Sequence, residues 1–240
     1  MKILLTGTSS GIGQNLLHYL AQKKHEVYVI NRRKTNGPYV REFICDLSRP
    51  DELINLKNEI EKIHFEALIN NAASGRVKRF QDITLNDLTY EFNLNTLSPI
   101  ILIQYVLKNM LKQGYGKILN ISSISAKEGT PYLYIYSATK AALDSFTQSL
   151  SKTFTKNGIT INSFCLGGIE TNMSIQGRKK ISSLHGLSED KYQERMISLM
   201  GLNKLINIDE LAQLLSFYLS KETDIISGQT INICGTLELR

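Results

Sequence analysis

Short apolar runs alternate with longer segments of helical periodicity along most of the chain. The short runs predict β-strands, and the longer segments, which repeat an apolar residue every three or four positions, predict amphipathic helices. The predicted strands span residues 2–6, 26–31, 40–45, 67–70, 117–122, 160–165 and 229–233. The predicted helices span residues 11–22, a segment that begins at Pro50, 85–111 in two pieces, 132–155 and 208–219.

This alternation predicts a parallel β-sheet with helices on both faces. Because crossovers between parallel strands are right-handed, we expect an α/β fold with a Rossmann-like, doubly wound sheet of about seven strands. A barrel of eight strand–helix units is the alternative, but a chain of 240 residues is short for it. We expect a single domain over residues 1–240.

Residues 174–204 interrupt the pattern. They contain Gly177, Gly186 and Gly201, give no strand signal and show only weak helical periodicity. Long irregular segments in compact domains often carry function. We interpret this segment as a lid over a binding cleft, and a solvated insertion is the alternative.

Composition is typical of a soluble globular protein. Hydrophobic residues make up 42% of the chain and charged residues 21%, which excludes a disordered, collagenous or coiled-coil chain. Cys45, Cys165 and Cys234 are too scattered for a disulfide framework or a zinc site, so we expect core thiols in a reducing compartment and no metal. Without an apolar run long enough for a signal peptide or a membrane span, we expect a cytoplasmic protein that does not bind membranes.

The net charge of +6 changes this picture little. Nucleic-acid-binding proteins gather positive charge in a stripe, whereas the only basic runs here are Arg32–Lys34 and Arg178–Lys180, so we expect no nucleic-acid partner. The segment 174–204 holds six basic and three acidic residues. That excess suits an acidic partner, such as an acyl carrier protein, or a phosphorylated or nucleotide-linked sugar, although a solvated loop is at least an equal alternative.

A glycine-rich turn follows the first predicted strand and opens the first helix. Gly7 and Gly11 permit a tight turn, and Gly13 permits close packing of the helix on the sheet. The backbone N–H groups at the start of the helix form an anion site, for which a pyrophosphate is the natural occupant. The spacing and context therefore predict dinucleotide binding.

The second predicted strand ends at Asn31, followed by Arg32 and Arg33. An acidic residue at this position would bind the ribose hydroxyls of NAD, whereas guanidinium groups bind a 2′-phosphate. We therefore favour NADP(H) over NAD(H), with a solvated basic turn as the alternative. Asp46, at the end of the third strand, is positioned either to accept from the adenine amino group or to cap the next helix.

Tyr136 and Lys140 lie one helical turn apart, so they share a face of the helix. An ammonium beside a phenol favours the phenolate, and we expect it to lower the pKa of Tyr136 from about 10. Ser122 and Ser123 end the fifth strand, at the edge of the sheet where ligands bind in open α/β folds. We expect these hydroxyls to converge beside the dinucleotide.

The chain resembles the short-chain dehydrogenase/reductase family over nearly its whole length, because these motifs follow one another in the order and spacing of that family. The matching positions are Thr6-Gly7-x-x-x-Gly11-x-Gly13, Asp46-Leu47, Asn70-Asn71-Ala72, Asn93, Ser123, Tyr136-x-x-x-Lys140 and Gly167-x-x-x-Thr171. Alanine at 73, leucine at 166 and Cys234-Gly235-Thr236 near the end depart from the family's usual residues, but no catalytic group is missing.

The resemblance implies a role for each catalytic candidate. Tyr136 would exchange the proton of a carbonyl oxygen, Lys140 would assist it and hold the nicotinamide ribose, and Ser123 would orient the carbonyl. Asn93 would hold a water that links Lys140 to solvent, with Asn95 as its rival, and Ile169 and Thr171 would contact the nicotinamide side of the cofactor. The candidate cofactor-binding residues are Gly7, Ser9, Ser10, Gly11, Ile12, Gly13, Asn31, Arg32, Arg33, Asp46, Leu47, Asn70, Ala72, Tyr136, Lys140, Gly167, Ile169 and Thr171.

The resemblance also suggests substrates and assembly. The chain is most similar to 3-oxoacyl-acyl-carrier-protein reductases, so a 3-oxoacyl thioester is the first candidate and a sugar or other secondary alcohol the second. A cofactor-binding redox sensor is the non-enzymatic alternative. A homotetramer or homodimer is expected through helices near 97–111 and 137–155. These helices carry more apolar residues than the face that packs on the sheet needs, namely Ile101, Leu102, Val106, Leu143, Phe146 and Leu150.

Overall fold

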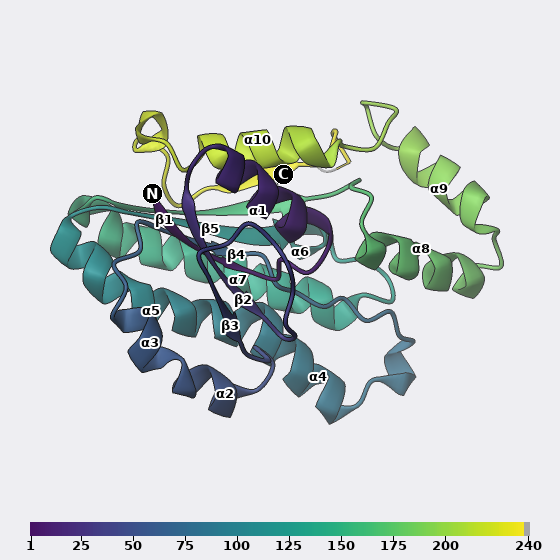
Figure 1. Cartoon of the computed structure of the whole chain (residues 1–240). Helices are drawn as coiled ribbons and strands as arrows, with labels where there is room; N and C mark the ends of the chain where they lie inside the picture. Colours follow the sequence, from purple (N-terminus) through teal and green to yellow (C-terminus); the bar gives the residue numbers. More distant parts are fainter. Residues whose placement is uncertain (238–240) are drawn as a thin grey trace.

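One parallel sheet organises the fold. The computed structural model describes residues 1–237, and its seven strands pair in the order β3-β2-β1-β4-β5-β6-β7 (Figure 1). Their bounds are β1 (Lys2–Thr6), β2 (Glu26–Asn31), β3 (Arg41–Ile44), β4 (Ala67–Asn70), β5 (Gly116–Ser123), β6 (Ile159–Leu166) and β7 (Thr230–Ile233). The doubly wound sheet is thus confirmed. The barrel alternative is wrong, because β3 and β7 are the edges of an open sheet.

Helices cover both faces of the sheet (Figure 1). One face carries α1 (Gly11–Gln22) and α10 (Ile208–Phe217). The other carries α2 (Pro50–Asn55), α3 (Lys57–Glu61), α4 (Leu85–Phe92), α5 (Ser98–Gln113) and α7 (Tyr134–Phe154). A short helix that the sequence did not predict, α6 (Ser125–Glu128), follows β5.

Alternate residues of the central strands enter two hydrophobic cores. Ile3 and Leu5 of β1 pack with α1 and α10, whereas Leu4 packs with the helices of the opposite face. Every residue of β5 and β6 is buried, which is typical of parallel strands covered on both sides. This arrangement leaves the carboxyl ends of the strands as the accessible edge on which a site can be built.

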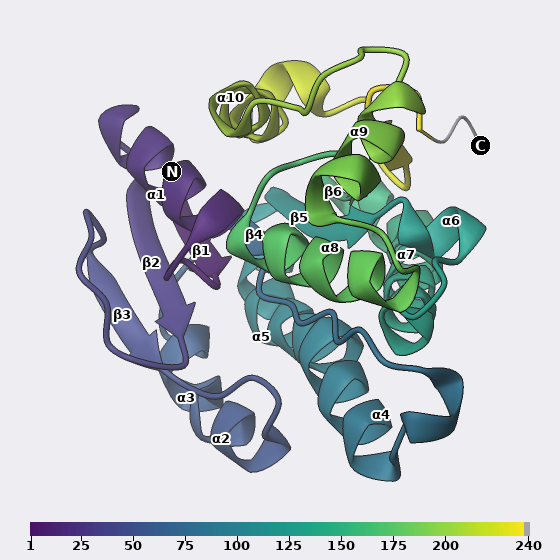
Figure 2. The ribbon, with the colours of Figure 1, turned by 90° about the vertical axis from the view of Figure 1, so that its right-hand side faces the viewer.

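Most of the segment 174–204, which the sequence pattern left irregular and which we interpret as a lid, is helical. It forms α8 (Asn172–Leu184) and α9 (Glu189–Ser198), which lie across the carboxyl ends of the strands (Figure 2). Capping side chains start both helices: Thr171 and Ser174 form a capping box for α8, and Ser188 caps α9. The sequence pattern was weak because α8 buries only Arg178, Ile181 and Ser182, and α9 buries no residue.

The expected second apolar face of the long helices is smaller than predicted. Leu102, Val106 and Leu143 are buried against the sheet of the same chain, which leaves Ile101, Phe146 and Leu150 as the partly exposed members of that set. All three cysteines are buried, as expected. Over residues 1–237, no helix is both long and apolar enough to cross a bilayer.

Candidate active site at the carboxyl ends of the strands

Each glycine of the turn between β1 and α1 is required by its backbone conformation or by lack of space. Gly7 has φ +72° and Gly11 has φ +56°, conformations that L-residues rarely adopt. A Cβ at Gly13 would lie 2.1 Å from the Gly7 carbonyl oxygen and 2.5 Å from Asn71 Nδ2. The turn is therefore a backbone cradle in which each of these glycines is required by geometry.

The start of α1 has no side-chain cap. Ser10 occupies the N-cap with an extended backbone, but its side chain accepts no hydrogen bond from the helix, and the first turn holds no acidic residue. The positive end of the helix dipole is thus left for an outside anion. Thr171, at the start of α8, lies against this end, since a Cβ at Gly11 would be 3.5 Å from its methyl carbon. These features fit the pyrophosphate of a dinucleotide.

Two side chains that sequence reasoning did not assign hold the turn in place. Thr6 Oγ1 accepts hydrogen bonds from the backbone N–H groups of Asn71 and Ala72, each at 3.0 Å. The Asn71 amide in turn donates to the carbonyls of Thr6 and Gly7 at 3.0 Å. Both residues belong to the motifs quoted above, but neither of them received a role from the sequence pattern. The end of β4 and Ala72 are thereby fixed against the glycine turn.

Asn31 at the end of β2 is a bracing residue. Its Oδ1 accepts from the Thr8 backbone N–H at 2.8 Å, and its amide nitrogen donates to Thr8 Oγ1 at 2.8 Å and to Glu42 Oε1 at 2.9 Å. The side chain is 3% exposed. Because both ends of its amide are engaged, Asn31 links the glycine turn to β3 rather than offering a free group to a ribose.

Arg32 and Arg33 differ from Asn31 in being exposed. Among residues 1–237, neither forms an ion pair. Asp46 Oδ1 accepts from the backbone N–H and hydroxyl of Ser48, at 3.0 and 2.6 Å, so this carboxylate stabilises the turn before α2, and Leu47 beside it is buried. Two guanidinium groups at the end of β2 thus remain available to an anionic ligand.

Asn70 belongs to a row of buried polar side chains across the middle of the sheet. Its amide donates to Asn120 Oδ1 at 2.8 Å, Asn120 donates to Thr147 Oγ1 at 2.9 Å, and Thr147 lies 3.1 Å from Ser163 Oγ. This row connects β4, β5, α7 and β6. Asn70 is thus held by a hydrogen bond inside the sheet, at the end of β4.

Tyr136, Lys140 and Ser123 come together beside the cradle. Lys140 Nζ donates to the Ile121 carbonyl at 2.7 Å and lies 5.7 Å from the centre of the Tyr136 ring. The Ser123 hydroxyl forms a hydrogen bond with the Tyr136 hydroxyl, whereas Ser122 lies on a different side of β5, next to Asp144. The structure thus brings the expected serine, tyrosine and lysine into one cluster.

Burial dominates the electrostatics of this cluster. It raises the pKa of Tyr136 to about 12, with smaller contributions from Glu91, Asp144 and Cys165, and the bond from Ser123 acts in the opposite direction. It lowers the pKa of Lys140 to about 8, against the opposing effect of Asp144. The expectation that the pKa of Tyr136 lies below about 10 is therefore wrong for this structure, because desolvation by burial raises it.

The two asparagine candidates point to opposite sides of their helix. Asn93 donates to the Ser48 carbonyl at 3.0 Å, on the side of α2 and away from Lys140. Asn95 is fully buried and donates to Thr139 Oγ1 at 3.1 Å, next to Lys140 on α7. The placement of Asn93 beside Lys140 was therefore wrong. The segment Asn93–Leu97 is π-helical. Side chains two positions apart on a helix point in directions that differ by about 200°, so Asn93 and Asn95 lie on opposite sides.

The segment after β6 closes the cluster from above. Ile169 is buried and pairs with Ile206 in an isolated parallel bridge. A Cβ at Gly167 would lie 2.6 Å from Ile124 Cδ1, so a larger residue here would displace the Ile124 side chain. Thr171 then caps α8 by accepting from the Ser174 backbone N–H at 3.1 Å. Gly167, Ile169 and Thr171 thus form the connection between β6 and α8.

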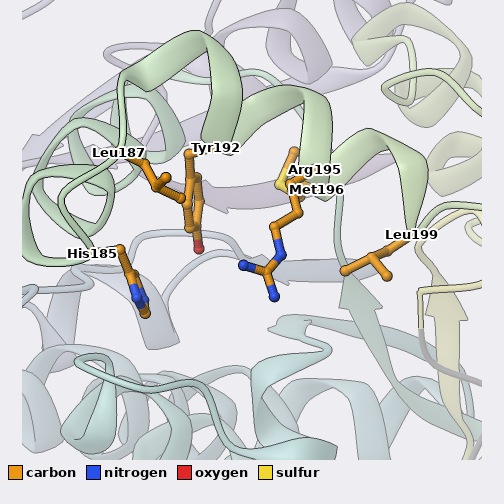
Figure 3. Close-up of a pocket in the computed structure, with 6 residues that line it drawn as sticks. All are labelled: His185, Leu187, Tyr192, Arg195, Met196 and Leu199. Carbon is orange, nitrogen blue, oxygen red and sulfur yellow. The ribbon is translucent and has the colours of Figure 1, made fainter.

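A cavity of about 240 Å³ opens beside α9. Its lining residues are His185, Leu187, Tyr192, Arg195, Met196 and Leu199 (Figure 3). The His185 ring packs edge-on against Tyr132, with centroids 5.6 Å apart, four residues before Tyr136 in the chain. The cavity is thus formed by the end of α8 and by α9, and His185 connects it to Tyr132, just before α7.

Comparison with known proteins adds independent information. The family model for short chain dehydrogenase matches residues 1–182. A diacetyl reductase of the (S)-acetoin-forming type from Staphylococcus epidermidis is 29% identical over 99% of this chain and 98% of its own length. A 3-oxoacyl-acyl-carrier-protein reductase from Aquifex aeolicus is 28% identical over 97% of this chain and 95% of its own.

Solved structures share the fold. A variant of actinorhodin polyketide ketoreductase with NADPH superimposes with a TM-score of 0.90 at 24% identity, covering 98% of this chain and 96% of that one. A 4-hydroxyisoleucine dehydrogenase complexed with NADH gives 0.84 at 23% identity, covering 98% of this chain and 97% of that one. The fold thus occurs in proteins that bind either nicotinamide dinucleotide.

Proposed function

Because the chain belongs to the short-chain dehydrogenase family and is an oxidoreductase acting on CH–OH groups, we propose that it interconverts a ketone and a secondary alcohol with NADP(H), using Tyr136 to transfer the proton. The observation that carries this proposal is the meeting of Ser123, Tyr136 and Lys140 at the carboxyl end of β5. The nicotinamide cofactor supplies or takes up the hydride at C4 of its ring.

The electrostatics support the proton transfer. With a pKa near 12, Tyr136 stays protonated at neutral pH and is ready to donate to a carbonyl oxygen. Lys140, whose pKa is about 8, is able to gain or lose a proton near neutrality and can restore the phenol. Ser123, already bonded to Tyr136, is placed to stabilise negative charge that develops on the same oxygen.

The proposed cofactor rests on two groups of residues. The cradle of Gly7, Gly11 and Gly13 and the uncapped start of α1 would hold the pyrophosphate. Arg32 and Arg33 would pair with the 2′-phosphate that distinguishes NADP(H) from NAD(H). The NADPH-bound polyketide ketoreductase agrees with this choice, and the NADH-bound 4-hydroxyisoleucine dehydrogenase makes NAD(H) the alternative.

We assign to Asn95, instead of Asn93, the role of holding the water that connects Lys140 to solvent. Asn95 is fully buried and reaches α7 at Thr139, the residue before Lys140. A side chain that bonds the Ser48 carbonyl, as Asn93 does, cannot serve the same group.

For the substrate, we propose a 3-oxoacyl thioester, on the model of the acyl-carrier-protein reductase relative. The basic excess of residues 174–204 favours an acidic carrier. The diacetyl reductase relative and the modest lid cavity favour the second candidate, a small ketone or secondary alcohol. We also propose that the protein forms a homodimer or homotetramer through α5 and α7, and light scattering that shows only monomer at micromolar concentration would contradict it.

The experiment follows the absorbance of NADPH and NADH side by side with acetoacetyl-coenzyme A, diacetyl and fructose. We expect at least one carbonyl to consume NADPH faster than NADH. Tyr136→Phe should lose turnover by roughly 10²–10⁴-fold yet keep its NADPH affinity. Tyr134→Phe, two residues earlier on the exposed start of α7, is the matched control. NADPH binding without consumption of any carbonyl would favour the redox sensor.

A further inference from the structure

A glutamate that the proposed mechanism does not use is buried behind Tyr136. Glu91, near the end of α4, has no exposed surface. Its Oε1 accepts from the Arg76 backbone N–H at 3.0 Å, and its Oε2 has no hydrogen-bond partner among the residues that the structure describes. An apolar residue would fill this volume without burying a charge, so a half-satisfied carboxylate calls for an explanation.

Glu91 and Asn95 hold the same short segment from one helix face. Asn95, one turn further on, accepts from the Ser74 backbone N–H at 2.9 Å and donates to the Ser74 carbonyl at 2.8 Å. Between these two anchors lies Gly75, where a Cβ would be only 3.3 Å from Tyr136 Cδ2. The segment 74–76 is therefore a wall pressed against the Tyr136 ring, and Glu91 holds its outer end.

The charged groups around Glu91 come from three elements. Arg76 and Lys78 lie on the loop after β4, Asp87 on α4 itself, and Tyr136 on α7. Asp87 is occupied by both cations: its Oδ1 lies 3.1 Å from Arg76 Nη1, and its Oδ2 lies 2.5 Å from Lys78 Nζ. Burial raises the pKa of Glu91 to about 7, and Arg76 and Lys78 counteract this only in part.

We propose, on the basis of the proposed function, that Glu91 is a positioning residue that holds segment 74–76 against the Tyr136 ring and places a buried carboxyl group behind this wall. When Glu91 is ionised, its negative charge disfavours the phenolate and raises the pKa of Tyr136. When Glu91 is protonated, that effect disappears. We therefore expect Glu91 to contribute to the pH dependence of the reaction near neutrality, in addition to Lys140.

Two substitutions separate the two parts of this role. Glu91→Gln keeps an oxygen that can accept from the Arg76 N–H but removes the charge. Glu91→Leu removes both and fills the space. Asp87→Asn is the matched control: it removes a carboxylate one turn earlier on the same helix, but the pKa of Asp87 is held well below its ordinary value by Lys78 and Thr84, so this group does not titrate near neutrality.

The readouts are pH profiles of kcat and kcat/KM in both directions, NADPH affinity by calorimetry, and hydrogen exchange of the Arg76 amide. For Glu91→Gln we expect the inflection near pH 7 to vanish, the oxidation profile to move to lower pH, and Arg76 to stay protected. For Glu91→Leu we expect kcat/KM to fall roughly tenfold or more, as for the loss of a hydrogen bond to a charged group, and the Arg76 amide to exchange faster. Asp87→Asn should keep an inflection but move it to lower pH, because Glu91 loses a neighbouring negative charge while Arg76 and Lys78 remain.

Two results would overturn the proposal. One is a Glu91→Gln profile with the same inflection as the unmodified protein, and the other is unchanged Arg76 exchange in Glu91→Leu. A merely structural role would lower the melting temperature without moving either readout. If the unmodified protein reduces no carbonyl, the proposed function fails. The exchange measurement, together with a carbon NMR titration of Glu91, then still tests whether the residue holds the wall and titrates near 7.

Discussion

Replacement of Gly13 by alanine tests the cradle most directly. The added Cβ would lie 2.1 Å from the Gly7 carbonyl oxygen, so this oxygen or the start of α1 has to move by about 1 Å to reach an ordinary contact. Overpacking of this kind costs about 1–3 kcal/mol. The same movement breaks the hydrogen bond of 3.0 Å from Asn71 to Gly7, which contributes about 0.5–1.5 kcal/mol.

Together these effects lower the free energy of unfolding by about 2–4 kcal/mol. For a chain of this size, that corresponds to a fall in melting temperature of roughly 5–15 °C. Urea unfolding and a calorimetric titration with NADPH measure the two consequences. We expect a lower urea midpoint and at least about tenfold weaker NADPH binding, since the displaced carbonyl belongs to the turn that would hold the pyrophosphate.

Gly177→Ala is the matched control. Gly177 lies inside α8, and a Cβ there would be 4.0 Å from Val77 Cγ2, an ordinary contact. Removing a glycine from a helix interior should stabilise the protein by about 0.5–1 kcal/mol. A Gly13→Ala protein with an unchanged urea midpoint and unchanged NADPH affinity would refute the reasoning from steric overlap.

Three further predictions concern single side chains. Arg32→Ala should weaken NADPH binding by roughly 10–100-fold and NADH binding much less, and equal weakening in paired titrations would remove the 2′-phosphate assignment. Asn95→Ala should lower kcat about tenfold or more, because three hydrogen bonds to Ser74 and Thr139 are lost. In the same assay Asn93→Ala, which loses one hydrogen bond to a carbonyl, should stay near the rate of the unmodified protein. A larger loss in Asn93→Ala than in Asn95→Ala would restore Asn93 to the site. Burial raises the pKa of Glu91 to about 7 from an ordinary 4.5, so between these pH values the folded state binds a proton that the unfolded state releases. The free energy of unfolding should therefore fall by up to about 3 kcal/mol as pH rises from 4.5 to 7. Urea unfolding at pH 5 and pH 8 should show this loss in the unmodified protein and not in Glu91→Gln, and the same pH dependence in both proteins would contradict it.

Local patterns were enough to predict most of the fold. Strand β1 and helix α1 depend on apolar periodicity and on the glycines between them, both of which are visible in the sequence. The lid helices α8 and α9 escaped prediction because they bury few apolar residues, so their periodicity is faint. Their capping residues Thr171 and Ser188 carried the available signal.

The site was harder to predict where tertiary contacts decide. Asn93 and Asn95 are the same residue type two positions apart, so the sequence does not distinguish them. Only the course of the π-helical segment determines which one reaches α7. The pKa of Tyr136 depends on burial by residues distant in sequence, so the nearby Lys140 gave a misleading sign. Asn31 was predicted to meet the cofactor, but Glu42 and Thr8 occupy its amide.

The polar row across β4, β5 and β6 has a consequence for how the sheet assembles. Asn70 is the direct neighbour of Asn120 across β4 and β5, and Asn120 is the direct neighbour of Ser163 across β5 and β6. A slip of two residues between such strands keeps every apolar side chain on its own face, so hydrophobicity alone does not forbid it. It would, however, strand these amides without partners in the interior. The row therefore favours one strand alignment during folding. That alignment also fixes where Ser123 stands, along the strand direction, relative to Gly7.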